Sequence, residues 1–168
     1  MPNEDMLKGL KTALETEMNG IEFYRIAAEK TEDAKAKEVF QTLANDEARH
    51  FIELKKHHDA LLKTGKWDAA IELGKPSEFK GSSPIFSDDF KSRVKDRHFE
   101  MSALSIGALL ETNSIDFYRR MKDLTRNLNA QRFFAELQSW EERHLDAIVR
   151  QLDLVKEEFW QNAHWSPY

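Results

Sequence analysis

The two halves of the chain repeat each other at a constant offset of 94 residues. Residues 111–119 reproduce residues 17–25 with six of nine positions identical, and the same offset relates Glu47 to Glu141. Agreement of this many polar and aromatic residues at one offset indicates an internal duplication. The second half is therefore expected to form the same supersecondary unit as the first, and the two units to pack about a pseudo-twofold axis.

Each half predicts a pair of long helices. Half of the glycines and prolines lie between residues 64 and 90, whereas the flanking segments are rich in Ala, Leu, Glu, Lys and Arg, which favour helix. Short breaks near residues 31–33 and 125–127 divide each flank in two, and Asp33 and Asn127 can cap the helices that follow. The predicted helices span residues 4–30, 34–63, 98–124 and 128–159.

Apolar residues recur at alternating steps of three and four along all four predicted helices, which is the pattern of an amphipathic helix with one buried face. In the first half they include Leu7, Leu10, Leu14, Ile21, Ala28, Ala36, Val39, Leu43, Leu54 and Leu61. In the second half they include Met101, Leu104, Ala108, Ile115, Ala130, Phe133, Leu137, Ile148 and Val155. Two such hairpins predict an all-α, antiparallel four-helix bundle with one long crossover between the second and third helices.

Six polar residues interrupt these apolar faces. They are Glu17, Glu47, His50, Glu111, Glu141 and His144. Residues equidistant from the turn of an antiparallel hairpin lie at the same height, and each half has two glutamates that lie 15 residues to either side of its predicted turn. At a rise of roughly 1.5 Å per residue, both pairs lie about 20 Å from their turns. Packing the hairpins together therefore brings all six side chains into one layer.

A buried layer of four carboxylates needs a counter-charge, because an unpaired buried carboxylate is strongly destabilising. Two divalent cations balance four carboxylates, and two neutral imidazoles complete the ligand set. The chain has no cysteine, so carboxylate and imidazole are its only strong metal ligands. Oxygen ligands with one nitrogen for each metal suit iron or manganese and also admit zinc. The pattern therefore predicts a two-metal site.

The strength of this prediction lies in the combination of the motifs. A single Glu-x-x-His is a weak signal, since glutamate is common and one such motif arises by accident in many helical chains. Two of these motifs, in phase with two further glutamates on apolar faces, are far more specific. The alternative is a bundle with a buried polar network, which would need partners for four carboxylates that the apolar faces do not offer.

Composition predicts a soluble, cytoplasmic protein. The 168 residues are 40% hydrophobic and 33% charged, no apolar run has the length of a membrane-spanning helix, and the N-terminus is acidic, unlike a signal peptide. The net charge of −5 and the scattered Lys and Arg residues argue against nucleic-acid binding. One domain is expected over residues 1–168. It comprises a hairpin (4–63), a crossover (64–97), a second hairpin (98–160) and an aromatic tail (161–168).

Several segments resemble the rubrerythrin family. These are Asn45-Asp-Glu-Ala-Arg-His50, Glu141-Glu-Arg-His144, and a glutamate followed seven residues later by tyrosine on the first and third helices. The resemblance covers about residues 4–160. It implies a ferritin-like fold with a non-haem di-iron centre, in which Glu47 and Glu141 bridge the two irons and Glu17 and Glu111 are terminal ligands. In characterised relatives it also implies reduction of peroxide.

Two departures from the family bear on the reaction. Rubrerythrins typically end in a rubredoxin domain whose iron is bound by four cysteines, and this chain has none. Electrons for reducing peroxide or O₂ would therefore come from an external donor such as a rubredoxin-type protein. The family also has an additional glutamate three residues after the first one on the third helix, which takes part in redox-linked iron movement. That position is Ser114 here.

Four functions stay open from the sequence. The first is a di-iron oxidoreductase with a role in oxidative stress, expected as a homodimer. The second is a ferroxidase or iron-handling protein that forms a large hollow oligomer. The third is a di-iron hydroxylase, which would need a channel for an apolar substrate. The fourth is a purely structural role with zinc in the site.

Several other residues carry predictions about the surroundings of the metals. Tyr24 and Tyr118 can donate hydrogen bonds near the site, or be core residues with a satisfied hydroxyl. Glu22 and Asp116 can accept from the histidine rings, although a solvated face is the simpler explanation for both. His57 is expected to lie in the core or at the surface and not to bind metal. The crossover is expected to pack on the bundle through Trp67, Phe79, Ile85, Phe86 and Phe90, with a short helix capped at residues 87–89, and the tail to dock on the bundle or on a partner subunit.

Overall fold

A computed structural model describes residues 3–77 and 98–162. Its described residues form four α-helices. These are α1 (Asn3–Lys30), α2 (Ala34–Thr64), α4 (His98–Leu124) and α5 (Leu128–Asn162). The predicted bounds agree with the observed ones within one residue except at the end of α5, which extends three residues beyond the predicted end at residue 159.

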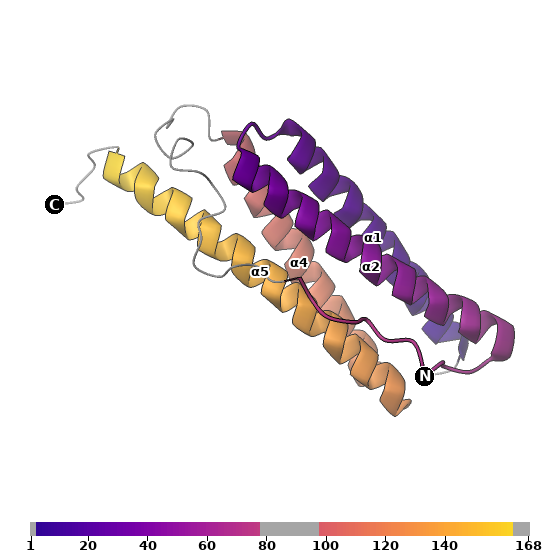
Figure 1. Cartoon of the computed structure of the whole chain (residues 1–168). Helices are drawn as coiled ribbons and strands as arrows, with labels where there is room; N and C mark the ends of the chain where they lie inside the picture. The colour runs from indigo at the N-terminus through magenta and orange to yellow at the C-terminus, as the bar shows by residue number, and fades with distance from the viewer. Residues whose placement is uncertain (1–2, 78–97, 163–168) are drawn as a thin grey trace.

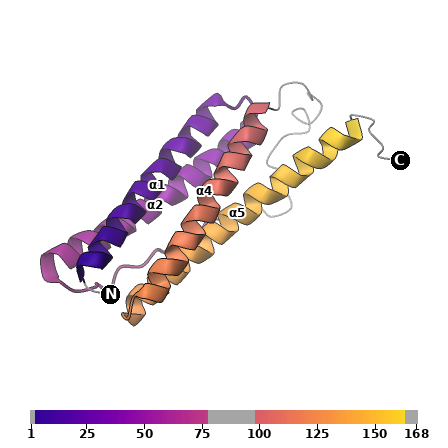
Figure 2. The same ribbon diagram turned by 180° about the vertical axis from the view of Figure 1, so that it is seen from behind.

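The four helices form two antiparallel hairpins, α1 with α2 and α4 with α5, which pack side by side into a bundle (Figures 1 and 2). The turn between α1 and α2 lies at the opposite end of the bundle from the turn between α4 and α5. The chain between α2 and α4 must therefore connect the two ends of the bundle. The predicted all-α, ferritin-like bundle with one long crossover is confirmed.

Side-chain caps define the turns within the hairpins. Asp33 has extended backbone angles, and its carboxylate accepts a hydrogen bond of 2.9 Å from the backbone N–H of Ala36 at the start of α2. Asn127 makes the equivalent bond to the N–H of Ala130 at 3.2 Å. At the other end of α2, Gly65 has a φ of 69° and its N–H donates to Leu61. A residue without a side chain adopts this left-handed conformation at low cost, which lets the helix end there.

Two apolar clusters lie on either side of the layer that contains the six polar residues. The first cluster, nearer the α1–α2 turn, includes Tyr24, Phe40, Leu43, Leu104 and Ile148. The second, nearer the α4–α5 turn, includes Leu10, Leu54, Tyr118, Phe134, Leu137 and Trp140. Each fully buried large apolar side chain contributes about 1.5–3 kcal/mol. Together the clusters stabilise a bundle whose centre is polar.

The first part of the crossover packs against the bundle through Trp67. Its ring stacks on His57, with centroids 3.9 Å apart and planes 18° apart, and also contacts Phe133. Leu73 is buried in the same region. Predicted packing is thus confirmed for Trp67. The expectations for Phe79, Ile85, Phe86 and Phe90, for the cap at 87–89 and for the docking of the aromatic tail fall on residues outside the described part of the chain.

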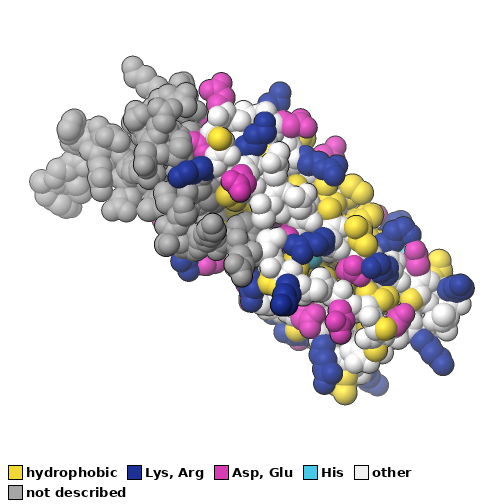
Figure 3. Space-filling model, in the orientation of Figure 1, with side chains coloured by type: hydrophobic (Ala, Val, Ile, Leu, Met, Phe, Trp, Pro, Cys, Tyr) yellow, Lys and Arg dark blue, Asp and Glu magenta, His cyan; other side chains and the backbone are white. Residues whose placement is uncertain are grey.

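The described helices carry both signs of charge on their exposed faces. Figure 3 shows Lys and Arg side chains interspersed with Asp and Glu along the bundle, with apolar side chains between them. None of the helices in the described part of the chain is long and apolar enough to cross a membrane.

Candidate metal centre

Six side chains from all four helices meet in the middle of the bundle. Each of them is buried, with only a few per cent of its surface exposed. They are Glu17 from α1, Glu47 and His50 from α2, Glu111 from α4, and Glu141 and His144 from α5. Each of these positions lies on the inward face because it continues the three- and four-residue spacing of the core leucines. All six residues predicted from the sequence are therefore brought together.

The six form two overlapping groups of four, within each of which one ligand atom per residue lies less than 4.8 Å from the others. The first group contains Glu17 and His50, and the second contains Glu111 and His144. Both groups include Glu47 and Glu141. The geometry is thus that of two adjacent positions that share two carboxylates and have one further carboxylate and one imidazole each.

Both histidines turn the same ring nitrogen toward the carboxylates. In the first group, His50 Nδ1 lies 3.0 Å from Glu47, 3.2 Å from Glu141 and 3.3 Å from Glu17. In the second group, His144 Nδ1 lies 3.1 Å from Glu141, 3.3 Å from Glu47 and 3.6 Å from Glu111. The Nδ1 lone pairs are therefore directed at the space between the carboxylates, where a metal ion would lie.

The shared carboxylates divide their oxygens between the two groups. Glu47 directs Oε2 to His50 and Oε1 to His144. Glu141 does the reverse, with Oε1 toward His50 and Oε2 toward His144. A carboxylate that presents one oxygen to each of two positions is suited to bridge two ions.

The two tyrosines of the repeat donate hydrogen bonds to the outer glutamates across the bundle. Tyr24 on α1 donates to Glu111 on α4, and Tyr118 on α4 donates to Glu17 on α1. Burial raises the pKa of both hydroxyls well above the ordinary value, and the adjacent carboxylates raise it further. Both hydroxyls therefore stay protonated and act as donors. The two interpretations offered by the sequence both apply, since these are core residues with hydroxyls satisfied by candidate ligands.

Burial makes the charges of this cluster interdependent. It raises the pKa of Glu17 and Glu111 well above the ordinary value, and the nearby Glu47 raises it further. Burial also opposes the charge on Glu47, but the two histidines outweigh it and hold the pKa of that carboxyl below its usual range. The histidines in turn have raised pKa values, because the surrounding carboxylates outweigh burial. Without metal ions, the negative charge of the carboxylates is therefore neutralised by protons bound to the outer glutamates and to the histidines.

The donor set fits two divalent ions. When ionised, the four carboxylates carry more negative charge than the two imidazoles can balance, even when both imidazoles are protonated. Within the described part of the chain, Glu141 Oε1 is buried and accepts no hydrogen bond, although His50 Nδ1 lies nearby. Oxygen and nitrogen donors without sulfur suit iron or manganese and admit zinc. The chemistry is therefore that of a two-metal carboxylate centre.

A residue that sequence reasoning missed lies behind one of the histidines. Asp46 Oδ2 is 3.2 Å from His144 Nε2, and its side chain is fully buried. The only signal in the sequence was a charged residue directly before Glu47. Since the repeat partner of Asp46 is Trp140, a comparison of the two halves did not reveal it.

Two residues expected to accept from the histidine rings do not do so. Glu22 is exposed, and Asp116 is partly exposed and pairs with Arg119 on its own helix at 2.7 Å. Both follow a candidate ligand by five residues, which turns them away from the inward face of the helix. Glu22 and Asp116 therefore belong to a solvent-facing side of their helices, which is the alternative that the sequence had left open.

Small residues occupy the position three residues after each outer glutamate. Ser114 is buried on α4, and its repeat partner on α1 is Gly20. A Cβ at Gly20 would lie 3.3 Å from Glu47 Cγ, so the close approach of α1 to this shared carboxylate requires a glycine or a shift of the carboxylate. Neither position offers a fifth carboxylate.

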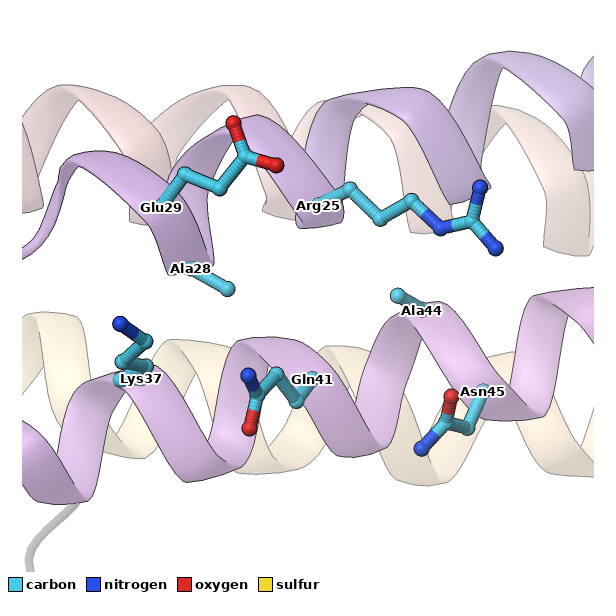
Figure 4. Close-up of a pocket in the computed structure, with 7 residues that line it drawn as sticks. All are labelled: Arg25, Ala28, Glu29, Lys37, Gln41, Ala44 and Asn45. Carbon is cyan, nitrogen blue, oxygen red and sulfur yellow. The ribbon is translucent and has the colours of Figure 1, made fainter.

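A surface pocket of about 350 Å³ lies between α1 and α2 (Figure 4). It is lined by Arg25, Ala28, Glu29, Lys37, Gln41, Ala44 and Asn45. None of the six candidate ligands lines it, and its charged and amide side chains do not form the apolar channel that a hydroxylase would need.

Comparison with known protein families matches residues 8–152 to the Rubrerythrin family. The match covers most of both hairpins and all six residues of the centre. No curated protein and no solved structure matches the chain. The duplicated hairpin, the shared carboxylates and this match agree. The chain belongs to the rubrerythrin family.

Proposed function

We propose that the six clustered residues hold two iron ions and that the protein reduces peroxide, or O₂, with electrons from a separate donor. The observation that carries this proposal is the sharing of Glu47 and Glu141 by two otherwise separate ligand groups. Two separate mononuclear sites would not need common carboxylates. A two-electron reduction is best served by two redox metals held side by side.

The residues divide into bridging and outer ligands. Glu47 and Glu141 would bridge, since each directs one oxygen to either group. The outer ligands would be Glu17 with His50 for one ion and Glu111 with His144 for the other, following the two groups described above. Each ion would then have three carboxylates and one imidazole from the protein, which leaves coordination positions for an incoming ligand.

The bound iron would supply two electrons, which with two protons reduce one hydrogen peroxide to two waters. The protein's own contribution is orientation. Tyr24 and Tyr118 fix the outer carboxylates by donating to one oxygen of each. The ring of Tyr24 stacks on Phe40 and the ring of Tyr118 stacks on Phe134, with centroids 6.4 and 6.3 Å apart. Apolar side chains therefore pack against both tyrosines, one on each side of the polar layer. These side chains limit the entry of bulk water.

The proposal also includes a separate electron donor, a homodimeric assembly and a cytoplasmic location. Because the chain has no cysteine, it contains no four-cysteine iron site, and a rubredoxin-type protein would deliver the electrons. A cytoplasmic homodimer is the assembly we propose.

Iron oxidation without peroxide turnover is the second candidate. It is favoured by Ser114, because the family's additional glutamate is replaced there by a residue that is a poor iron ligand. In that case O₂ would oxidise the bound ferrous ions, and the product would be stored or passed on. A large hollow oligomer in size-exclusion chromatography would support this candidate over the first.

The test is anaerobic loading with two equivalents of Fe²⁺ followed by stoichiometric peroxide. The proposal predicts a rapid optical change that consumes one peroxide for each pair of irons. It also predicts re-reduction and repeated turnover when a rubredoxin-type donor is added. A protein whose bound iron is oxidised but is not re-reduced by the donor is an iron oxidase, and one that responds to neither peroxide nor O₂ is not an oxidoreductase of this kind. Glu38→Ala, which changes an exposed residue of α2, is the control variant.

A further inference from the structure

The duplication preserves the six candidate ligands but not the residue that precedes each Glu-x-x-His motif. That residue is Asp46 in the first half and Trp140 in the second. Both side chains are buried, at 0% and 5% exposure. The two halves of the centre therefore differ in what lies behind their histidines.

His144 has a carboxylate behind it. Its Nδ1 faces the candidate metal position, and its Nε2 lies 3.2 Å from Asp46 Oδ2. An imidazole that binds a metal through Nδ1 carries its proton on Nε2 and can donate it to this carboxylate. Such a partner fixes the ring orientation and makes the imidazole a stronger ligand.

His50 has an aromatic ring in the corresponding place. The centroids of His50 and Trp140 are 4.9 Å apart and the rings are inclined by 68°. His50 Nε2 is buried and makes no hydrogen bond to any part of the chain that the structure describes. On its Nε2 side this imidazole is positioned by aromatic packing, and no carboxylate of the described residues lies behind it as Asp46 does behind His144.

The carboxylate of Asp46 is itself held in place. It accepts hydrogen bonds from Arg49 and, at 2.6 Å, from the hydroxyl of Ser77. Arg49 also donates to the backbone carbonyl of Lys75 at 3.0 Å, and its guanidinium lies 5.1 Å from the centroid of Trp140. One arginine therefore contacts both residues that distinguish the two halves. These contacts keep Asp46 directed at His144.

We propose that Asp46 makes the two metal positions unequal, so that the ion bound by His144 and Glu111 is held more tightly than the ion bound by His50 and Glu17. The inference rests on the proposed two-metal centre. It assigns to Asp46 the role of a positioning residue that acts through His144. The first ion enters the position that has the carboxylate behind it, and the second is the exchangeable one.

Two binding steps alone would not test this, since ions that share Glu47 and Glu141 bind in two steps even at identical positions. The informative comparison removes one outer ligand at a time. Glu17→Gln weakens the His50 position and leaves the His144 position intact, whereas Glu111→Gln does the opposite. The two changes are matched, because each glutamate accepts from one tyrosine of the other hairpin.

The experiment is calorimetric titration of the metal-free full chain with Co²⁺, with the cobalt absorption bands as an independent readout of coordination. The affinity for the first Co²⁺ is expected to stay near that of the wild type in Glu17→Gln and to fall about 10- to 100-fold in Glu111→Gln. Adding Asp46→Asn to Glu17→Gln is expected to lower the affinity for the first Co²⁺ to near that of Glu111→Gln. Adding it to Glu111→Gln is expected to change the affinity little.

Equal first-step affinities in Glu17→Gln and Glu111→Gln would overturn the inference, as would an equal effect of Asp46→Asn in both backgrounds. If Asp46→Asn does not fold, the comparison of the two glutamate variants decides alone. Failure of the wild type to bind Co²⁺ at all would instead overturn the proposed two-metal centre. Glu38→Ala, which changes an exposed residue of α2, is the control and is expected to leave both affinities unchanged.

Discussion

The hydroxyl of Tyr24 on α1 donates a hydrogen bond to Glu111 on α4, so each hairpin orients a candidate ligand of the other. Helical side chains lean toward the N-terminus of their helix, which directs the Tyr24 ring back toward the layer of glutamates. The duplication makes the relationship reciprocal, since Tyr118 donates to Glu17. The two hairpins are therefore joined at the centre by polar contacts as well as by apolar packing.

Removing one of these hydroxyls should weaken the bundle. Tyr24→Phe leaves the buried Glu111 without its donor, and the loss of such a bond costs about 1–3 kcal/mol. Denaturant unfolding of the metal-free protein measures the change. Tyr118→Phe is the matched variant and is expected to cost a similar amount. Unfolding midpoints equal to that of the wild type for both variants would show that the hydroxyls do not support the cluster.

Metal binding should stabilise the fold. An ion that binds only the folded state at 100 times its dissociation constant adds about 2.7 kcal/mol, and each kcal/mol raises the Tm of a chain of this size by about 2–4 °C. We expect Fe²⁺ under anaerobic conditions to raise the Tm of the wild type by several degrees. Glu47→Ala, which removes a shared carboxylate, should lose most of this gain, whereas the exposed Glu38→Ala should keep it. An undiminished gain in Glu47→Ala would contradict the assignment.

His57 should make the protein less stable in mild acid. It is buried between Trp67 and Phe133, and burial lowers its pKa from 6.5 to about 4, against an opposing effect of Asp68. Between these pH values the unfolded chain binds a proton that the folded protein does not. The contribution of His57 is therefore complete above pH 6.5 and is lost as the pH falls toward 4.

The matched variant is His57→Phe, which keeps an aromatic ring in the stack and removes the titration. The difference between the free energies of unfolding of the two proteins should change between pH 7.5 and pH 4, with the wild type losing about 3 kcal/mol more than the variant. Other groups titrate equally in both proteins and cancel in the difference. Parallel curves would show that His57 is not held neutral by its surroundings.

The helix caps should affect stability without affecting the metals. Asp33→Ala removes the acceptor for the Ala36 N–H and should cost about 1 kcal/mol, as should Asn127→Ala at the equivalent turn. Both turns lie about 20 Å along the helices from the glutamate layer. Thermal unfolding should show the loss, and Co²⁺ affinity should be unchanged. A large fall in Co²⁺ affinity would mean that the turns and the centre are coupled.

The helices and the six clustered residues could be predicted because they depend on spacing. Glu47 had to face inward since it continues the period of its apolar neighbours, and its distance from the turn put it level with Glu17. Asp46 could not be found in this way. It lies beside the inward stripe, and its burial depends on its contacts with His144 on α5 and with Ser77 beyond the end of α2, which no periodicity within one helix encodes.

The partners of the tyrosines illustrate the same limit. Tyr24 lies seven residues after Glu17, and this spacing indicated a place near the site. The spacing did not indicate that its hydroxyl reaches Glu111, because the contact depends on the side-by-side packing of the antiparallel α1 and α4. Glu22 and Asp116 show the converse. Their correspondence across the repeat was real, but two equivalent positions can both face solvent.

The most direct test of the two-metal centre is the iron content of the purified protein after anaerobic loading with Fe²⁺ and removal of unbound metal. A two-metal centre predicts two irons per chain in the wild type. It predicts fewer than one in Glu47→Ala and in Glu141→Ala, because each change removes a ligand from both positions at once. One iron or none in the wild type, or two irons retained in both variants, would contradict it.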